Sequence, residues 1–127
     1  MTKVLLIAVG GGVGSVLRYA VSGWAQRMTS SGFPSGTLAV NVLGCLVIGF
    51  LGAALAGPVL VREEYRVAVM VGCLGGFTTF STYGLETVAL ASDGQAWRAV
   101  VNVLLQNALG LSAVWIGYRW ARAWVGV

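Results

Sequence analysis

Charged residues divide this sequence into long apolar segments. Residues 37–61, 67–85 and 99–118 contain no Asp, Glu, Lys or Arg, and residues 4–26 contain only Arg18. A helix needs roughly 20 apolar residues to cross a bilayer. The pattern therefore predicts an all-α membrane protein with a single transmembrane domain over residues 1–127. Its four transmembrane helices are expected at about residues 4–26, 37–60, 67–91 and 98–119.

The composition agrees with this class, because hydrophobic residues make up 57% of the chain and charged residues only 9%. A soluble domain needs about a quarter charged residues to cover its surface. The mean hydropathy of +0.84 therefore predicts an outer surface that contacts the lipid bilayer. The formal charge of +4 is scattered along the chain. No basic patch is interleaved with aromatic residues, so nucleic acid is not expected as a partner.

Basic residues near the span ends give only a modest orientation signal. If both termini lie on one side of the membrane, that side carries Lys3, Arg62, Arg66, Arg119 and Arg122. The other side carries Arg27 and Arg98, and also Arg18 if that side chain reaches outward. One interpretation is a chain with both termini in the cytoplasm. The other is a chain that inserts both ways and forms antiparallel dimers.

Polar residues within the spans favour an oligomer. They are Arg18, Asn41, Glu86, Asn102, Gln106 and Asn107. Polar side chains that face lipid are costly, so several of these should face a partner or a water-filled cavity. One chain of 13.2 kDa offers little interior in which to hide all of them.

Glycines in the spans predict close contacts between helices. Gly10 and Gly14 form one GxxxG pair, and Gly72 and Gly76 form another. This spacing lets two helix backbones approach closely in lipid. A phosphate-binding loop at residues 10–15 is not favoured, because no Lys-Ser/Thr follows and the GxGxxG register breaks at Ser15.

The third span contains a segment with low helix propensity, GCLGGFTTFSTYGLE over residues 72–86. Gly75-Gly76 and the β-branched pair Thr78-Thr79 lie near the middle of the apolar run. A break at that depth frees backbone groups, which protein, a cavity or an ion must then satisfy. The alternative is a continuous, flexible helix whose hydroxyls bond back to its own carbonyls.

Aromatic residues follow this segment at helical spacing. Phe77, Phe80 and Tyr83 share one face, with Ser81 and Thr82 beside them. Such a stripe often belongs to a packed core. It also suits a small anion, because aromatic ring edges are positive and hydroxyls donate hydrogen bonds.

Three segments together resemble the CrcB/Fluc family of fluoride channels. They are GGGVGSVLRY at 10–19, GTLAVNVLG at 36–44 and GGFTTFSTYGLE at 75–86, of which the third is the most specific. The resemblance covers the whole chain. It implies an antiparallel, dual-topology homodimer in the bacterial plasma (inner) membrane, with two pores. These would pass fluoride passively out of the cytoplasm, exclude chloride and thereby give fluoride resistance.

The same resemblance implies roles for particular residues. Asn41 matches the pore-lining asparagine of the second span, and Phe80 and Tyr83 match the two aromatic positions that face fluoride. Further polar pore or vestibule positions are Thr37, Ser81, Thr82, Asn107 and Arg18. The main-chain carbonyls of Gly75 and Thr78 match those that hold a structural sodium ion at the dimer centre.

Two positions depart from the family pattern. Tyr83 stands where phenylalanine is common, so its hydroxyl could add a donor to the pore or block it. Asn107 and Leu111 stand where the fourth span usually offers serines.

Other functional classes fit less well. A proton-coupled multidrug exporter of the small four-span type needs a membrane-embedded carboxylate, usually in the first span. Here the first span has Arg18 and no acid, and Glu86 is the one carboxylate within a span. A non-transporting assembly subunit lacks a recognisable docking motif. Enzymatic activity is not expected, because the chain has no His, no embedded acid pair and no nucleophile with a base.

Overall fold

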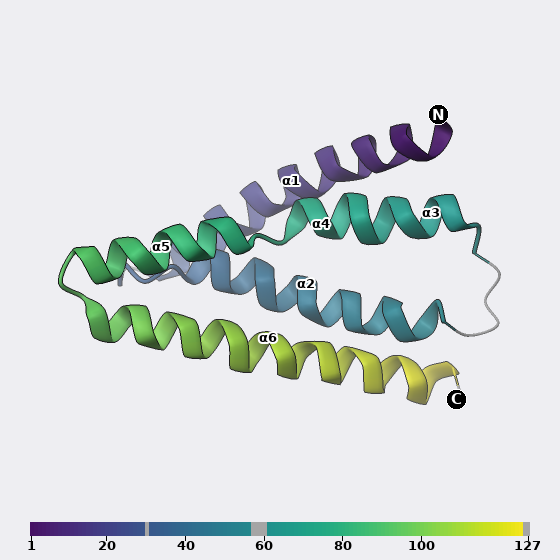
Figure 1. Cartoon of the computed structure of the whole chain (residues 1–127). Helices are drawn as coiled ribbons and strands as arrows, with labels where there is room; N and C mark the ends of the chain where they lie inside the picture. The colour runs from purple at the N-terminus through teal and green to yellow at the C-terminus, as the bar shows by residue number, and fades with distance from the viewer. Residues whose placement is uncertain (30, 57–60, 126–127) are drawn as a thin grey trace.

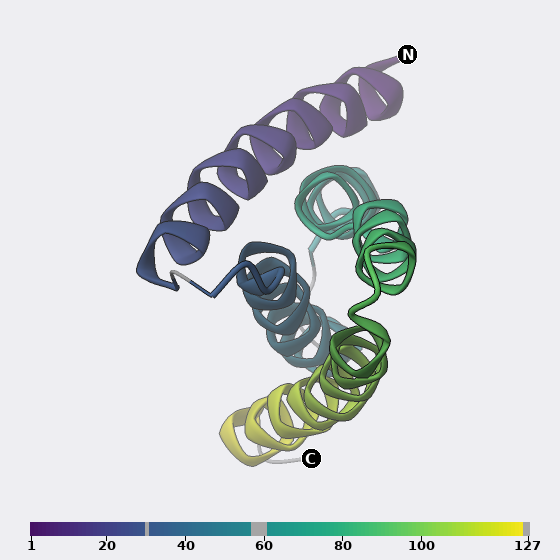
Figure 2. The ribbon, with the colours of Figure 1, turned by 90° about the vertical axis from the view of Figure 1, so that its left-hand side faces the viewer.

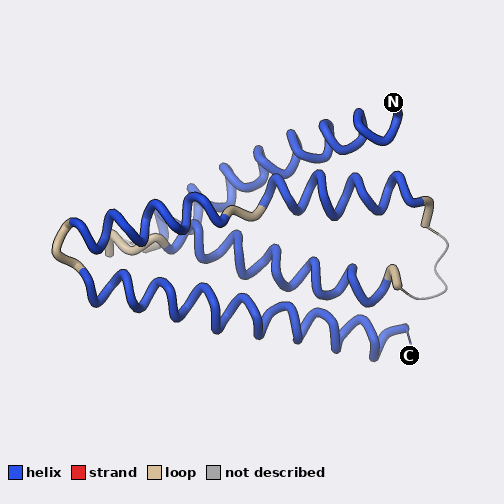
Figure 3. The backbone as a smooth tube through the Cα atoms, in the orientation of Figure 1, coloured by secondary structure: helices blue, strands red, loops and turns tan. Residues whose placement is uncertain are grey.

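The protein is a bundle of long helices. The computed structural model describes residues 1–29, 31–56 and 61–125. All its regular elements are helical in these ranges, as Figure 3 shows. They are α1 (Thr2–Met28), α2 (Ser35–Ala54), α3 (Glu63–Val67), the π-helix η1 (Ala68–Cys73), α4 (Leu74–Phe77), α5 (Phe80–Ser92) and α6 (Ala96–Val125).

Four segments are long and apolar enough to cross a membrane, as the charge pattern predicted: Thr2–Met28, Ser35–Ala54, Glu63–Ser92 and Ala96–Trp124. The predicted second span, 37–60, extends beyond the end of α2 at Ala54. Its last residues, 57–60, lie outside the described residues. The apolar sequence continues to Val61, so hydrophobicity alone does not mark the end of this helix.

The surface of the single chain is strongly apolar. Leu5, Leu104 and Leu111 are each more than 60% exposed, at 64%, 62% and 71%. The buried apolar side chains are mostly small ones, such as Ala99 and Ala113. This distribution is typical of a protein in lipid, where close packing of small residues holds helices together.

Both GxxxG pairs lie at close contacts between helix backbones, as their spacing predicted, and the two segments that carry them pack on each other. A Cβ at Gly14 would overlap the carbonyl of Cys73, and a Cβ at Gly72 would lie 2.7 Å from the carbonyl of Ile7. α1 therefore packs backbone to backbone against η1 and α4. Figure 2 shows α2 between α1 and α6. α2 packs mainly on α6, where Gly117 approaches the carbonyl of Leu46.

The third long segment changes its packing partner halfway along. Its first part, α3 to α4, packs on α1, and its second part, α5, packs on α6. Thr78 (φ −81°, ψ 160°) and Thr79 (φ −152°, ψ 116°) lie between the two parts with extended backbone. Figure 1 shows this junction about midway along the bundle, with both chain termini at one end.

Candidate functional site

Asn41 on α2 holds the extended backbone of the α4–α5 junction. Its Oδ1 accepts a hydrogen bond from the amide of Thr79 (2.8 Å), and its Nδ2 donates to the carbonyl of Thr79 (3.0 Å). Extended residues lose the partners that a helix supplies, and an unpaired backbone group is costly inside a bilayer. One side-chain amide thus satisfies both backbone groups of Thr79.

The same amide connects the junction to α6, because Asn41 Nδ2 also donates to Oε1 of Gln106 (3.1 Å). Gln106 is only 9% exposed. The predicted fourth-span residue, Asn107, lines the same cleft but is exposed and donates to the carbonyl of Val103 in its own helix (2.8 Å). Sequence reasoning missed Gln106 as a site residue. The sequence signal for Gln106 is its four-residue spacing from Asn102 and from Gly110. The structure buries all three residues.

Thr79 also begins α5. Its Oγ1 accepts a hydrogen bond from the amide of Thr82 (3.2 Å), as an N-cap side chain does. The same hydroxyl donates to Thr82 Oγ1 (2.9 Å) and lies 3.3 Å from Ser81 Oγ. The structure therefore brings the predicted residues Ser81 and Thr82 together around Thr79, which sequence reasoning did not place in the site.

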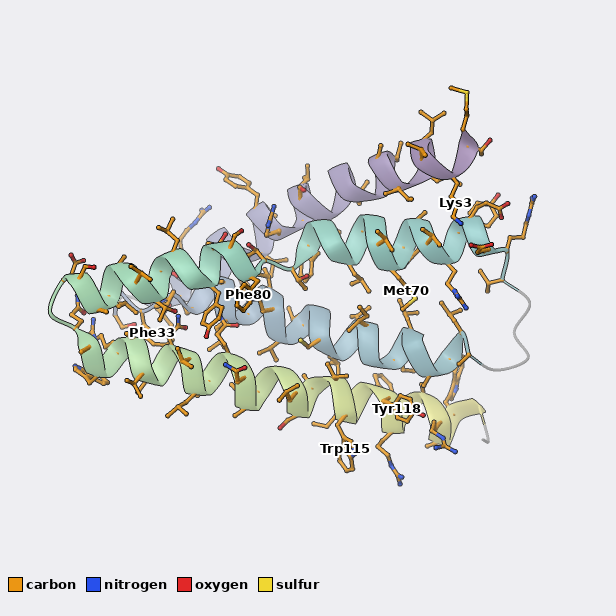
Figure 4. The ribbon with its side chains drawn as sticks, viewed as in Figure 1. Lys3, Phe33, Met70, Phe80, Trp115 and Tyr118 are labelled. Atoms are coloured by element: carbon orange, nitrogen blue, oxygen red, sulfur yellow. The ribbon has the colours of Figure 1, made fainter. Side chains whose placement is uncertain are left out.

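Phe80 and Tyr83 contact each other edge to face. Their ring centroids lie 5.3 Å apart at an interplanar angle of 71°. Phe80 is 82% exposed, at the junction shown in Figure 4, and Tyr83 is half-buried. Both rings line a cleft of about 360 Å³ together with Asn41, Thr79 and Gln106. This cleft combines amide groups with two aromatic rings.

A second cleft of about 300 Å³ is also lined by Thr79. It is lined by Arg18, Thr37, Thr79 and Thr82, with Ser15 and Ser22. Thr37 is 3% exposed and donates to Oε1 of Glu86 (2.8 Å). The predicted residues thus fall into two groups, and Thr79 lines both clefts.

Gly75 and Thr78 lie on the α4 side of the junction, where carbonyl groups lose helical partners. The amide of Thr79 donates to Asn41 and is not used for the carbonyl of Gly75, four residues earlier. A Cβ at Gly75 would meet nothing within 4 Å, so this position is open. The amide and hydroxyl of Thr78 both donate to the carbonyl of Leu74, at 3.0 Å each.

Three buried polar atoms lack a hydrogen-bond partner in the described part of the chain: Glu86 Oε2, Asn102 Oδ1 and Gln106 Nε2. Asn102 is fully buried and donates to the hydroxyl of Thr87 (2.9 Å). Buried polar groups normally find a partner, and within a membrane the cost of not doing so is high. The interior of one chain thus leaves hydrogen-bonding capacity unused near both clefts.

The chain matches one protein family over most of its length. Residues 5–118 match the family described as CrcB-like protein, Camphor Resistance (CrcB). The fluoride-specific ion channel FluC of Geobacter sulfurreducens is 45% identical over 122 residues, which cover 96% of this chain and 98% of that protein. The protein of the same name from Rhizobium etli is 42% identical over 125 residues, covering 98% and 100%. This chain therefore belongs to the CrcB-like family.

Proposed function

We propose that this chain forms a fluoride-specific ion channel. The observation that carries the proposal is the full-length match to proteins named fluoride-specific ion channel FluC. The chain belongs to an ion-channel family and is a multi-pass membrane protein, not an enzyme. We place it in the bacterial plasma (inner) membrane, where it lets fluoride leave the cytoplasm down its own gradient.

The two clefts suit the chemistry of a small, strongly hydrated anion. The first offers Nε2 of Gln106, which lacks a partner among the described residues, and the rings of Phe80 and Tyr83. The second offers the guanidinium of Arg18 and several hydroxyls. N–H groups, hydroxyls and positive ring edges can replace the water around fluoride in steps. Because Thr79 lines both clefts, we propose that the anion passes this residue.

A second copy of the chain completes each route in this proposal. Phe80 is 82% exposed, beside the cleft that it lines with Asn41. This exposure suits a surface that another protein chain covers. We propose an antiparallel, dual-topology homodimer, because basic residues at the two ends of the spans differ too little to fix one orientation.

The α4–α5 junction is the centre of this arrangement. Thr78 and Thr79 lie halfway along the thirty-residue segment Glu63–Ser92. We propose that their extended backbone breaks the third span at mid-membrane depth. Backbone without helical hydrogen bonds is tolerated at that depth only inside protein or beside a cavity. Asn41 supplies the first of these conditions through its two bonds to Thr79.

The residues present fit a structural sodium ion. Gly75 is open, and its carbonyl lacks the Thr79 amide as a partner. Main-chain oxygens without a carboxylate suit a hard monovalent cation. We propose that the carbonyls of Gly75 and Thr78 from both copies would hold sodium at the dimer centre. There it would neutralise carbonyl dipoles that the broken helices leave unpaired.

Fluoride efflux from liposomes tests the proposed function. Purified protein in vesicles loaded with potassium fluoride should release fluoride when valinomycin balances the charge, with no pH gradient present. Vesicles loaded with potassium chloride should retain chloride. Efflux that requires a proton gradient would instead favour an exporter that uses the carboxylate of Glu86. Equal release of chloride and fluoride would contradict the proposed specificity.

A further inference from the structure

α6 is longer than a bilayer requires. Its thirty residues, Ala96–Val125, span about 45 Å, whereas the hydrocarbon core is about 30 Å thick. Residues 99–118 are free of charge and account for the membrane crossing. Arg119 and Arg122 are the next charged residues, and they lie at the end of the molecule that carries both termini. Their guanidinium groups therefore reach the level of the lipid headgroups.

Four residues at this end of α6 form a cluster that we term the α6 collar: Trp115, Tyr118, Arg119 and Arg122. The Arg119 guanidinium lies over the Trp115 ring at 5.9 Å, and that of Arg122 lies over the Tyr118 ring at 5.9 Å. Trp115 is 64% exposed and Tyr118 44% exposed. Figure 4 shows Trp115 pointing away from the other helices. The collar is thus a basic surface that faces outward, and its aromatic rings hold the guanidinium groups in place.

Arg98, at the opposite end of the molecule, also lies over a tryptophan ring, that of Trp97, at 5.5 Å. However, its guanidinium donates to the carbonyl of Ser31 (3.1 Å) and to Oε1 of Gln95 (2.8 Å). Within residues 1–29, 31–56 and 61–125, the Arg119 guanidinium has no protein acceptor. Its N–H donors are therefore available to a ligand from outside the chain.

Two acidic residues at the collar end pair with basic residues outside α6. Glu63 pairs with Lys3 at 2.6 Å, and Glu64 lies 3.8 Å from Arg62. Both acids thus face basic residues of α1 and the α3 N-terminus, whereas the collar lies on α6. Neither acid therefore compensates the positive charge of Arg119.

A groove continues from the collar along α6 toward the membrane interior. Leu111, Ser112, Trp115 and Ile116 line it, with a volume of about 450 Å³. Leu111 is 71% exposed and Ile116 52% exposed. A ligand with a charged head and an apolar tail would place the head on Arg119 and the tail along this groove. A free inorganic anion would use only the first of these features.

We propose that the α6 collar is a binding site for an anionic phospholipid, with its phosphate on the guanidinium of Arg119 and one acyl chain in the groove. Guanidinium groups match phosphate oxygens in geometry and charge. Tryptophan and tyrosine settle at the headgroup level, where their rings are apolar and their polar atoms are hydrated. This site is separate from both clefts and does not depend on fluoride conduction.

Native mass spectrometry of the purified protein tests the proposal, with equal amounts of phosphatidylglycerol and phosphatidylcholine supplied in detergent. The natural chain should retain phosphatidylglycerol preferentially. Arg119→Gln should weaken its retention about fivefold, the effect of one basic group near an anionic lipid. The matched control is Arg27→Gln, because Arg27 is an exposed arginine at the opposite end of the molecule. Its retention of phosphatidylglycerol should stay that of the natural chain.

Trp115→Leu should lower retention less than Arg119→Gln, because it removes the ring that holds the guanidinium but keeps an apolar groove. Fluoride efflux in phosphatidylcholine vesicles should be unchanged in Arg119→Gln, which shows that the variant is folded. Equal losses in Arg119→Gln and Arg27→Gln would overturn the proposal in favour of diffuse attraction. Displacement of the lipid by millimolar inorganic phosphate would overturn it in favour of a simple anion site.

Discussion

Asn41 supplies hydrogen bonds that the peptide groups of a helix usually supply to one another. It pairs with both backbone groups of Thr79 and also reaches Gln106 on α6. A single side chain therefore connects α2, the α4–α5 junction and α6. Because it lines the larger cleft at the same time, its effects on stability and on ion passage should be coupled.

Asn41→Asp tests the contributions of Asn41 to stability and to ion passage. Aspartate has nearly the same shape as asparagine, so packing is retained. The aspartate keeps the acceptor for the Thr79 amide but loses the donor to Thr79 and Gln106 and adds negative charge. A lost buried hydrogen bond costs about 2 kcal/mol, which corresponds to roughly thirtyfold in rate if it acts on the barrier. Fluoride efflux should fall at least that far, and the melting temperature should fall as well.

The control for Asn41→Asp is Gln95→Glu, which adds the same charge at the α5–α6 turn, where Gln95 accepts a bond from Arg98. This variant should conduct fluoride normally. Full efflux in Asn41→Asp would remove Asn41 from the ion path.

Phe80→Ile tests whether an aromatic edge matters for conduction. Isoleucine is apolar and of similar bulk but has no positive edge, and it loses the edge-to-face contact with Tyr83. Such ring interactions contribute about 1 kcal/mol, so efflux should fall at least about fivefold. Dimers should persist in size-exclusion chromatography.

Phe33→Ile is the matched control for Phe80→Ile, because Phe33 follows α1 and lines neither cleft described above. Efflux should be normal in this variant. If both variants conduct like the natural chain, the ring of Phe80 has no part in the route.

Sequence reasoning named residues that line each of the two clefts but not the contacts that they make. Asn41 and Thr79 are 38 positions apart, and Asn41 and Gln106 are 65 apart, so no local pattern joins them. The choice between Gln106 and Asn107 depends on the rotation of α6, and adjacent amides leave that rotation ambiguous in the sequence. The functional roles of the site residues stay predictions.

At the scale of elements, the long helices followed directly from the positions of the charges, because uncharged runs of about 20 residues have few alternatives to a membrane helix. The local structure within these helices did not follow from the sequence. The π-helix Ala68–Cys73 has no marker in the sequence, and the end of α2 lies within a continuous apolar run. The extended pair Thr78-Thr79 does lie beside the glycines that lower helix propensity.

Contact between α1 and the η1–α4 segment gives a prediction for two glycines of one helix. Gly14→Ala places a methyl group against the carbonyl of Cys73, whereas Gly12→Ala meets nothing within 4 Å. Overpacking of this kind costs about 2 kcal/mol. Thermal unfolding in detergent should therefore show a clear loss of stability for Gly14→Ala. Gly12→Ala should be unchanged or more stable by up to about 1 kcal/mol, because alanine favours helix.

Equal stability of the Gly14→Ala and Gly12→Ala variants would show that the close approach of α1 is not needed for the fold. Equal loss in both would indicate that any added methyl group on α1 is harmful, for example through a contact with a second copy.

At the scale of the whole molecule, the single chain is incomplete in several independent ways. Phe80 is largely exposed, Gly75 faces open space, and buried polar atoms of α5 and α6 lack partners among the described residues. Phe80 and Gly75 lie at the α4–α5 junction, whereas the α6 collar lies at one end. One assembly contact at the junction would therefore cover both residues and leave the lipid surface of α6 free.

Sodium dependence is the sharpest test of that contact. If carbonyls of Gly75 and Thr78 from two copies share a sodium ion, its removal leaves four oxygens facing one another without a cation, which destabilises the dimer. Replacing sodium with N-methyl-D-glucamine at constant ionic strength should therefore lower the melting temperature and increase the monomer fraction. Fluoride efflux should fall in parallel, since both routes depend on the same contact. The effect should reverse when sodium is restored.

Potassium serves as the control for a monovalent cation of larger size, and it should rescue less well than sodium. Dimers and fluoride efflux that persist unchanged in the organic cation would show that the junction is satisfied by protein groups alone, through bonds such as those of Asn41 to Thr79.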